Sequence, residues 1–160
     1  AEKELINSLV EEGRMISAIP VSKKKLWSGE FSLPLNGEIV ITDTYGYSRL
    51  TGASTIAHKG TDFRAAVGTP VYAINSGTVR FTRNLRNYGH AIAIDHGTGV
   101  LSIYMHISEI GVEVGQEVAK GELIGKSGNT GYVIGPHLHL TIRINGISID
   151  PIRFFDIIKS

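Results

Sequence analysis

The residues best suited to catalysis in this chain are its six histidines, all of which lie between positions 58 and 139. His58 precedes Asp62 by four residues, and His137 and His139 lie two residues apart in a segment that alternates apolar and polar residues. In an extended strand, side chains two or four residues apart point to the same face. Each of these two pairs could therefore bind one metal ion.

A third candidate, His106, follows the apolar run 100–103. Imidazole nitrogen and carboxylate oxygen are both zinc ligands, and catalytic zinc sites use three protein ligands and keep a fourth position open for water. Two histidines and one aspartate would complete such a set. The spacing leaves open which imidazoles bind the ion, and a lone His106 is also compatible with a buried, hydrogen-bonded ring. We interpret His90 and His96 as structural.

Composition restricts the kinds of protein that this chain can be. The 160 residues correspond to one domain, and the absence of cysteine excludes a disulfide scaffold. Sixteen basic residues against fifteen acidic ones give a charge of +1, so we expect no nucleic-acid partner. The longest apolar stretches are far short of the ~20 residues of a membrane helix. We expect a monomer without a transmembrane segment.

Hydrophobic periodicity predicts two parts. Residues 1–30 form an amphipathic helix, which ends at Gly13, and an irregular lead-in; residues 31–160 form the main domain. Short β-branched runs bounded by Gly, Asn, Asp and Pro predict an antiparallel sheet with peripheral helices. The expected strands are 38–42, 70–74, 78–82, 91–95, 99–105, 117–119, 122–124 and 138–144.

Two segments of this sheet are similar to each other. Residues 67–79 and 114–125 each contain a glycine turn, a short strand, a second glycine turn and another strand. This weak duplication is typical of paired hairpins in a folded-over sheet.

The order of the motifs resembles the lysostaphin-type, LytM-like zinc endopeptidases, which cut peptide cross-links of bacterial cell walls. The motifs that carry the resemblance are His58-x-x-x-Asp62, Tyr104-x-His106-x-Ser108, Gly128-Asn129-Thr130-Gly131 and Gly135-Pro136-His137-Leu138-His139. The resemblance covers residues 31–151. It implies a mainly β domain over residues 31–160, with an antiparallel folded-over sheet, a duplicated motif and an open groove.

The resemblance also implies a role for each motif residue. His58, Asp62 and His139 would bind one zinc ion, and His106 and His137 would be catalytic imidazoles that bind no metal. One of these two rings would take a proton from the attacking water and the other would stabilise the developing oxyanion. The implied reaction is hydrolysis of peptide cross-links in peptidoglycan.

Some positions depart from the family pattern or are less defined. The family often has Glu soon after the His-x-His motif, where this chain has Thr141, so the supporting contact that this Glu would make is in question. Tyr45, Tyr47 and Asn129 are candidates for contacts with the substrate.

Three other functions compete with a wall peptidase. A biotinyl or lipoyl carrier would resemble the hairpins at 114–124, but such carriers need a lysine in a tight turn and no His-x-His motif. A catalytically silent wall-binding regulator of another hydrolase would keep the same motifs, with the lead-in blocking the site. A cytosolic zinc hydrolase of small peptides would fit the absence of a leader in this sequence. If the resemblance holds, the protein acts in the cell envelope or outside the cell after removal of a leader.

Overall fold

The structure is a computed structural model, which describes residues 2–46, 48–51, 54–57, 59–131, 133 and 135–158. Within these ranges the chain forms two helices and twelve strands. In chain order they are α1 (Glu2–Ser17), β1 (Ile41–Asp43), β2 (Ser48–Thr51), β3 (Ser54–Ala57), β4 (Thr61–Arg64), β5 (Pro70–Tyr72), β6 (Gly77–Leu85), β7 (Gly89–Gly97), β8 (Val100–Ile110), β9 (Glu117–Val118), β10 (Leu123–Ser127), β11 (His137–Ile144), β12 (Ile147–Ile149) and α2 (Pro151–Ile157).

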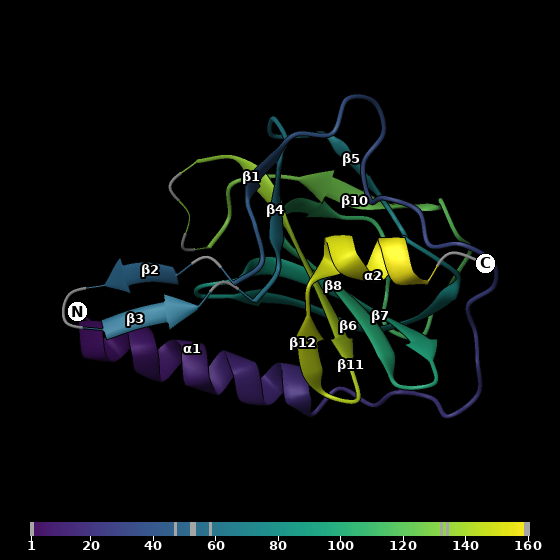
Figure 1. Ribbon diagram of the computed structural model, residues 1–160, viewed down its shortest axis with the longest axis horizontal. Coiled ribbons are helices and arrows are strands. Elements are labelled where there is room, and N and C mark those ends of the chain that lie inside the picture. The colour runs from purple at the N-terminus through teal and green to yellow at the C-terminus, as the bar shows by residue number, and fades with distance from the viewer. Residues whose placement is uncertain are drawn as a thin grey trace.

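Ten strands form one antiparallel sheet, which confirms the predicted fold class (Figure 1). The strand order is β1-β4-β11-β8-β7-β6-β9, β12 pairs with β11, and β10 pairs with both β5 and β8. The strands β2 and β3 form a separate hairpin. Among the described residues, no helix is long and apolar enough to cross a membrane.

The two similar segments pair with each other in the sheet. β5, the first strand of segment 67–79, pairs with β10, the second strand of segment 114–125. Conversely, β6 pairs with β9, so that the first strand of each segment meets the second strand of the other. Backbone hydrogen bonds continue this pairing beyond the strands, from Ala73 N–H to Glu122 O and from Gly121 N–H to Ala73 O. This reciprocal pairing joins the two segments within one sheet.

Apolar side chains pack on both faces of the central strands. On β11, Leu138, Leu140 and Ile142 belong to the larger core cluster, which also contains Phe154 of α2. On β8, Ile103 belongs to a second cluster on the opposite face, which includes residues of α1 and the segment after it. The two helices therefore cover different faces of the sheet.

The predicted end of the first helix at Gly13 is wrong, because α1 continues to Ser17. A glycine inside a helix costs about 1 kcal/mol relative to alanine. Contacts on both sides of this position offset the cost: Glu12 is buried against the β6–β7 turn, and Ile16 packs in the second core cluster. Tertiary contacts therefore extend the helix beyond the point where the local sequence favours its end.

Several elements were not among the expected helices and strands, namely α2, β4, β12 and the β2–β3 hairpin. At the start of α2, the Asp150 side chain accepts hydrogen bonds from the backbone N–H groups of Ile152 and Arg153, and Pro151 occupies the first turn. This combination of an aspartate cap and a following proline is a standard helix start. The sequence therefore carries a local signal for α2.

His96 is structural, as predicted from the sequence. Its ring is fully buried, with Nδ1 2.9 Å from the Ser76 carbonyl oxygen and Nε2 2.8 Å from the Ser102 hydroxyl. Because a carbonyl oxygen only accepts, Nδ1 carries the proton. The Ser102 hydroxyl lies 2.8 Å from that of Tyr104, which accepts the backbone N–H of Ile74. This buried chain connects β7, β8 and the segment after β5.

Burial lowers the pKa of His96 from 6.5 to about 4. In the unfolded chain His96 takes up a proton near pH 6.5, whereas in the folded chain it stays neutral until about pH 4. The stability that depends on the neutral ring is therefore present above pH 6.5 and is lost as the pH falls toward 4, by up to about 3 kcal/mol. His96→Gln should flatten this decline in urea unfolding of the metal-free protein between pH 7.5 and 4.

The matched control is His90→Gln, which changes a half-buried histidine of the same strand. This variant retains the buried His96 ring and should therefore retain the decline that depends on it. Equal slopes for His96→Gln and the unmodified protein would show that the buried ring does not set the pH dependence.

Candidate active site

Three adjacent strands bring the candidate site residues together. Asp62 of β4 lies directly opposite His139 of β11, and His139 lies opposite Met105 of β8. Side chains directly opposite in an antiparallel pair share one face of the sheet. Met105 packs in the second core cluster with residues of α1. The site therefore lies on the face of the sheet that α1 covers in part, beside that cluster.

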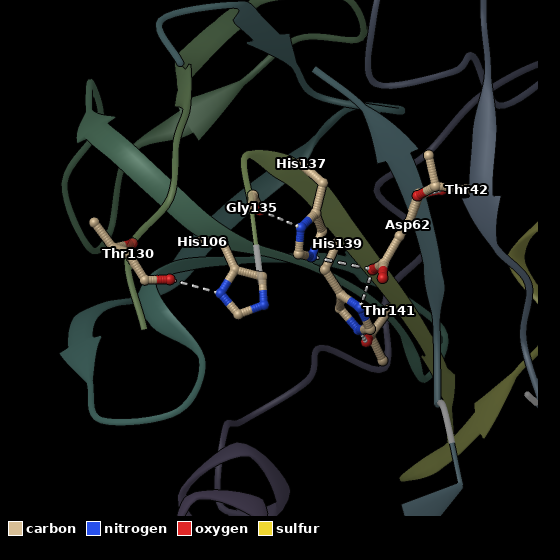
Figure 2. Close-up of polar contacts among 8 residues, drawn as sticks. All are labelled: Thr42, Asp62, His106, Thr130, Gly135, His137, His139 and Thr141. Atoms are coloured by element: carbon tan, nitrogen blue, oxygen red, sulfur yellow. Dashed lines mark hydrogen bonds and ion pairs between the residues drawn. The ribbon is translucent and has the colours of Figure 1, made fainter. Parts of the chain in front are cut away.

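Asp62 and His139 are in direct contact. The His139 Nδ1 atom lies 2.8 Å from Asp62 Oδ1, and the side chains are 11% and 5% exposed respectively (Figure 2). The other ring nitrogen of His139, Nε2, lies 2.8 Å from the Thr141 hydroxyl. Thr141, which stands where the family often has Glu, thus contacts the second histidine of the His-x-His motif.

The approach of Gly60 to His139 leaves no space for a side chain. A Cβ atom at position 60 would lie 2.5 Å from His139 Nε2 and would also overlap the Leu140 carbonyl oxygen. Glycine at this position therefore lets the imidazole lie against the backbone that leads into β4.

A β-bulge brings His106 to the site. Ile92 of β7 pairs with Tyr104 and His90 pairs with Ile107, so that Met105 and His106 together lie opposite one residue. His106 has a φ angle of 62°, which side chains other than glycine rarely adopt. A bulge shifts the alternation of side chains by one residue. Tyr104 and Ile107 consequently both point into the larger core, while His106 turns toward His137 and His139.

The orientation of the His106 ring is set by Thr130. Its Nδ1 atom lies 2.7 Å from the Thr130 carbonyl oxygen, so Nδ1 donates and Nε2 is directed away from this bond (Figure 2). Burial, with the nearby rings of His139 and His137, lowers the pKa of His106 from 6.5 to about 3, against the opposing effects of the Thr130 carbonyl and Asp62. At neutral pH the ring is therefore uncharged, with a lone pair on Nε2.

His137 approaches Asp62 from β11. Its Nδ1 donates to the Gly135 carbonyl oxygen at 2.9 Å, and its Nε2 lies 3.5 Å from Asp62 Oδ1. The His106 and His137 ring centroids are 4.9 Å apart. Both imidazoles are thus held through Nδ1 by a backbone carbonyl, which leaves Nε2 of each ring for other contacts.

Not every predicted site residue falls within the described part of the chain. His58 and Tyr47 lie outside it. The Tyr45 hydroxyl donates to the Ser148 carbonyl oxygen at 2.9 Å, which attaches the end of β1 to β12. Asn129 is exposed, next to Thr130. The roles of these residues in binding stay predictions.

Two of the described residues offer donor atoms of the kind that bind metal ions. Within the ranges given above, no group of three or more His, Asp or Glu side chains meets the geometry of a metal site. Asp62 and His139 nevertheless offer a carboxylate oxygen and an imidazole nitrogen at adjacent positions. Oxygen and nitrogen donors of this kind fit zinc.

The sequence patterns did not predict that Thr130 orients His106, and they did not predict the role of Gly60. The motif Gly128-Asn129-Thr130-Gly131 carried a signal for the first, since glycines flank Thr130 where backbones approach closely. A Cβ at Gly131 would overlap the backbone of the β6–β7 turn, at Gly89 N and Asn87 O. No comparable signal distinguishes Gly60 from an ordinary turn glycine.

Comparison with known proteins agrees with this arrangement. A family model described as peptidase family M23 matches residues 56–151, which is more than half of the chain. The chain belongs to peptidase family M23. The match includes every residue of the His and Asp motifs, whereas α1 and the lead-in precede it.

Solved structures of peptidases share this fold. The catalytic domain of the antimicrobial peptidase lysostaphin from Staphylococcus simulans is 35% identical, with a TM-score of 0.68, over 74% of this chain and 92% of that domain. A zinc-containing peptidase from Vibrio cholerae has a TM-score of 0.73 and 28% identity over 78% of this chain and 39% of that one.

One curated relative is named for an enzymatic activity. Peptidoglycan DD-endopeptidase ShyA of Vibrio cholerae is 44% identical over 96 residues. These residues make up 60% of this chain and 22% of the relative. The M23 segment is therefore a small part of that longer protein.

Gly60→Ala should disturb the site because the new methyl group meets both His139 and the β11 backbone. We expect a loss of stability of about 1–3 kcal/mol, typical of overpacking, together with a shift of the His139 ring signals in NMR spectra. Urea unfolding and the His139 signals are the measurements.

The control is Gly13→Ala, where a Cβ meets nothing within 4 Å and the residue lies inside α1. This change should increase stability by up to about 1 kcal/mol and leave the His139 signals in place. If Gly60→Ala unfolds at the same urea concentration as the unmodified protein, position 60 has room for a methyl group.

Proposed function

We propose that this chain is a zinc-dependent endopeptidase that hydrolyses peptide cross-links of bacterial peptidoglycan. The observation that carries the proposal is the contact between Asp62 and His139, with the rings of His106 and His137 beside it. Membership of family M23 and the name of the DD-endopeptidase relative support the reaction and the substrate. Such a substrate lies in the cell envelope or outside the cell.

The proposed zinc ligands are His58, Asp62 and His139. Bound zinc would lower the pKa of a coordinated water and polarise the scissile carbonyl. In His139, Thr141 stands next to Nε2, so Nδ1 is the nitrogen that faces Asp62 and would bind the metal. A partner at the second ring nitrogen fixes the tautomer and the orientation of a ligating histidine. Thr141 would have this role here.

His106 and His137 are the proposed catalytic side chains. Each donates its Nδ1–H to a backbone carbonyl, so each keeps Nε2 available to accept a proton, and can donate from Nε2 only when it is doubly protonated. One ring would accept the proton of the attacking water at Nε2 and return it to the leaving amine, while the other, as an imidazolium, would donate its Nε2–H to the developing oxyanion. The carbonyl partners prevent either ring from turning.

Defined wall fragments test the proposed reaction. The zinc-loaded chain is incubated with muropeptide dimers that carry either a direct link between D-alanine and a diamino acid or a glycine bridge. We expect one of the two classes to be cut, with mass spectrometry showing the addition of one water per bond. A chelator should stop cleavage, and zinc added afterwards should restore it.

The same experiment distinguishes the proposed peptidase from the competing function, a catalytically silent regulator. A silent regulator would bind intact wall material in a sedimentation assay and cut neither class of dimer. Cleavage that continues at full rate after complete removal of metal would contradict the zinc-dependent mechanism.

Substitution of the two kinds of histidine should have different effects. His106→Ala should retain zinc and reduce turnover by about 10²–10⁴-fold, the usual contribution of a general acid or base. His139→Ala should lose zinc as well as turnover, because it removes one of three proposed ligands. Zinc content by metal analysis and turnover on the cleaved dimer are measured together.

His90→Ala serves as the control for the loss of an imidazole, since position 90 is outside both proposed sets. It should retain zinc and turnover. A His106→Ala variant that turns over at the unmodified rate would remove His106 from the mechanism, and a His139→Ala variant with one zinc per chain would remove His139 from the ligand set.

A further inference from the structure

One contact of helix α1 with the sheet is made by a buried carboxylate, that of Glu12. Glu12 is 5% exposed, and its two carboxylate oxygens accept hydrogen bonds from the β6–β7 turn. Asn87 N–H lies 3.2 Å from both oxygens, Asn87 Nδ2 lies 2.8 Å from Oε2, and Tyr88 N–H lies 3.1 Å from Oε1. A buried carboxylate is costly unless its oxygens are paired in this way. Glu12 therefore fixes the position of this turn.

The same turn holds the backbone of His106. The N–H of His106 donates to the Tyr88 carbonyl oxygen at 2.9 Å. This bond lies at the bulge, where His106 has its positive φ angle. A strained backbone conformation persists only when surrounding contacts determine it. The Tyr88 carbonyl supplies one of these contacts, and the position of Tyr88 depends on Glu12.

The turn also supports the residue that orients the His106 ring. A Cβ at Gly89 would overlap Thr130, so the two backbones touch. The Thr130 hydroxyl accepts the N–H of His90 and donates to the Ile107 carbonyl oxygen. The Thr130 carbonyl in turn accepts the His106 Nδ1–H. Both the backbone and the ring of His106 are thus connected to the turn that Glu12 holds.

We propose that Glu12 is a positioning residue for His106, which connects a helix outside the M23-matched segment to the active site. This inference rests on the proposed function for its effect on turnover, but not for its effect on the His106 ring. Further contacts stabilise α1 in the same place: Asn87 Nδ2 also donates to the Ser8 hydroxyl, and Arg143 donates to the Ser17 hydroxyl. Glu12 is the member of this set that contacts the backbone of the turn.

The test variant is Glu12→Gln, which keeps the shape of the side chain but replaces one acceptor oxygen with an N–H donor. That donor would face the N–H groups of the turn and displace it. In zinc-free protein with ¹⁵N-labelled histidine, the His106 Nδ1–H signal should move toward that of a weaker hydrogen bond. In zinc-loaded protein, kcat should fall about 10–100-fold with KM and zinc content unchanged, as expected for a displaced catalytic group.

The matched control is Glu11→Gln, which makes the same chemical change at the exposed neighbouring position of α1. It should leave the His106 signal and kcat unchanged. Asn87→Ala is a milder second variant, because it removes one donor to Glu12 and retains the two backbone donors. It should shift the His106 signal in the same direction by a smaller amount, and it keeps the test informative if Glu12→Gln does not fold.

The two readouts separate the failure of this inference from the failure of the proposed function. A shifted His106 signal in a chain that cuts no dimer would support the positioning role and contradict the peptidase. An unchanged His106 signal in Glu12→Gln, or a fall in melting temperature with kcat unaltered, would overturn the positioning role and leave the peptidase untouched.

Discussion

The antiparallel register of β4, β11 and β8 is the constraint on which the site depends. It places Asp62 opposite His139 and His139 opposite Met105, so that a carboxylate and an imidazole meet on one face. A slip of one residue would turn these side chains to the other face. The register is held because Leu138 and Leu140, on the opposite face of β11, are fully buried in the larger core. The apolar side of the strand thus determines where its polar side points.

The face that carries the site is assembled from two kinds of contact. Beside His139, apolar packing of α1 on β7 and β8 excludes water from part of the sheet. At the site itself, short polar contacts through Thr130, Gly135 and Thr141 fix the imidazoles by their second nitrogens. Because these three partners come from the backbone or from a small hydroxyl, the rings are held in place without added charge.

The sequence predicted the antiparallel sheet and the similarity of two segments, because strand periodicity and glycine turns are local signals. It did not predict that the strands of each segment pair with those of the other. It also placed His137 and His139 on the polar face of β11, since strict alternation carries that information. It did not predict the route by which His106 reaches the site. Simple alternation puts His106 on the core side with Tyr104, and only the bulge reverses this. The predicted end of α1 at Gly13 was wrong for a related reason. The contacts of Glu12 with residues distant in sequence outweigh the local effect of Gly13.

The position of the His106 imidazole depends on the single extra residue of the bulge in β8. If one codon were lost at Met105, β8 would regain unbroken alternation. Tyr104 and Ile107 would still face the larger core, and the histidine would take the place of Met105 in the second core cluster, without the bulge that now turns it toward His137 and His139. A chain altered in this way would keep almost all of its sequence and its strands. Homologues derived from this sequence could therefore lose catalytic activity through the deletion of one residue, a change too small for overall sequence similarity to reveal.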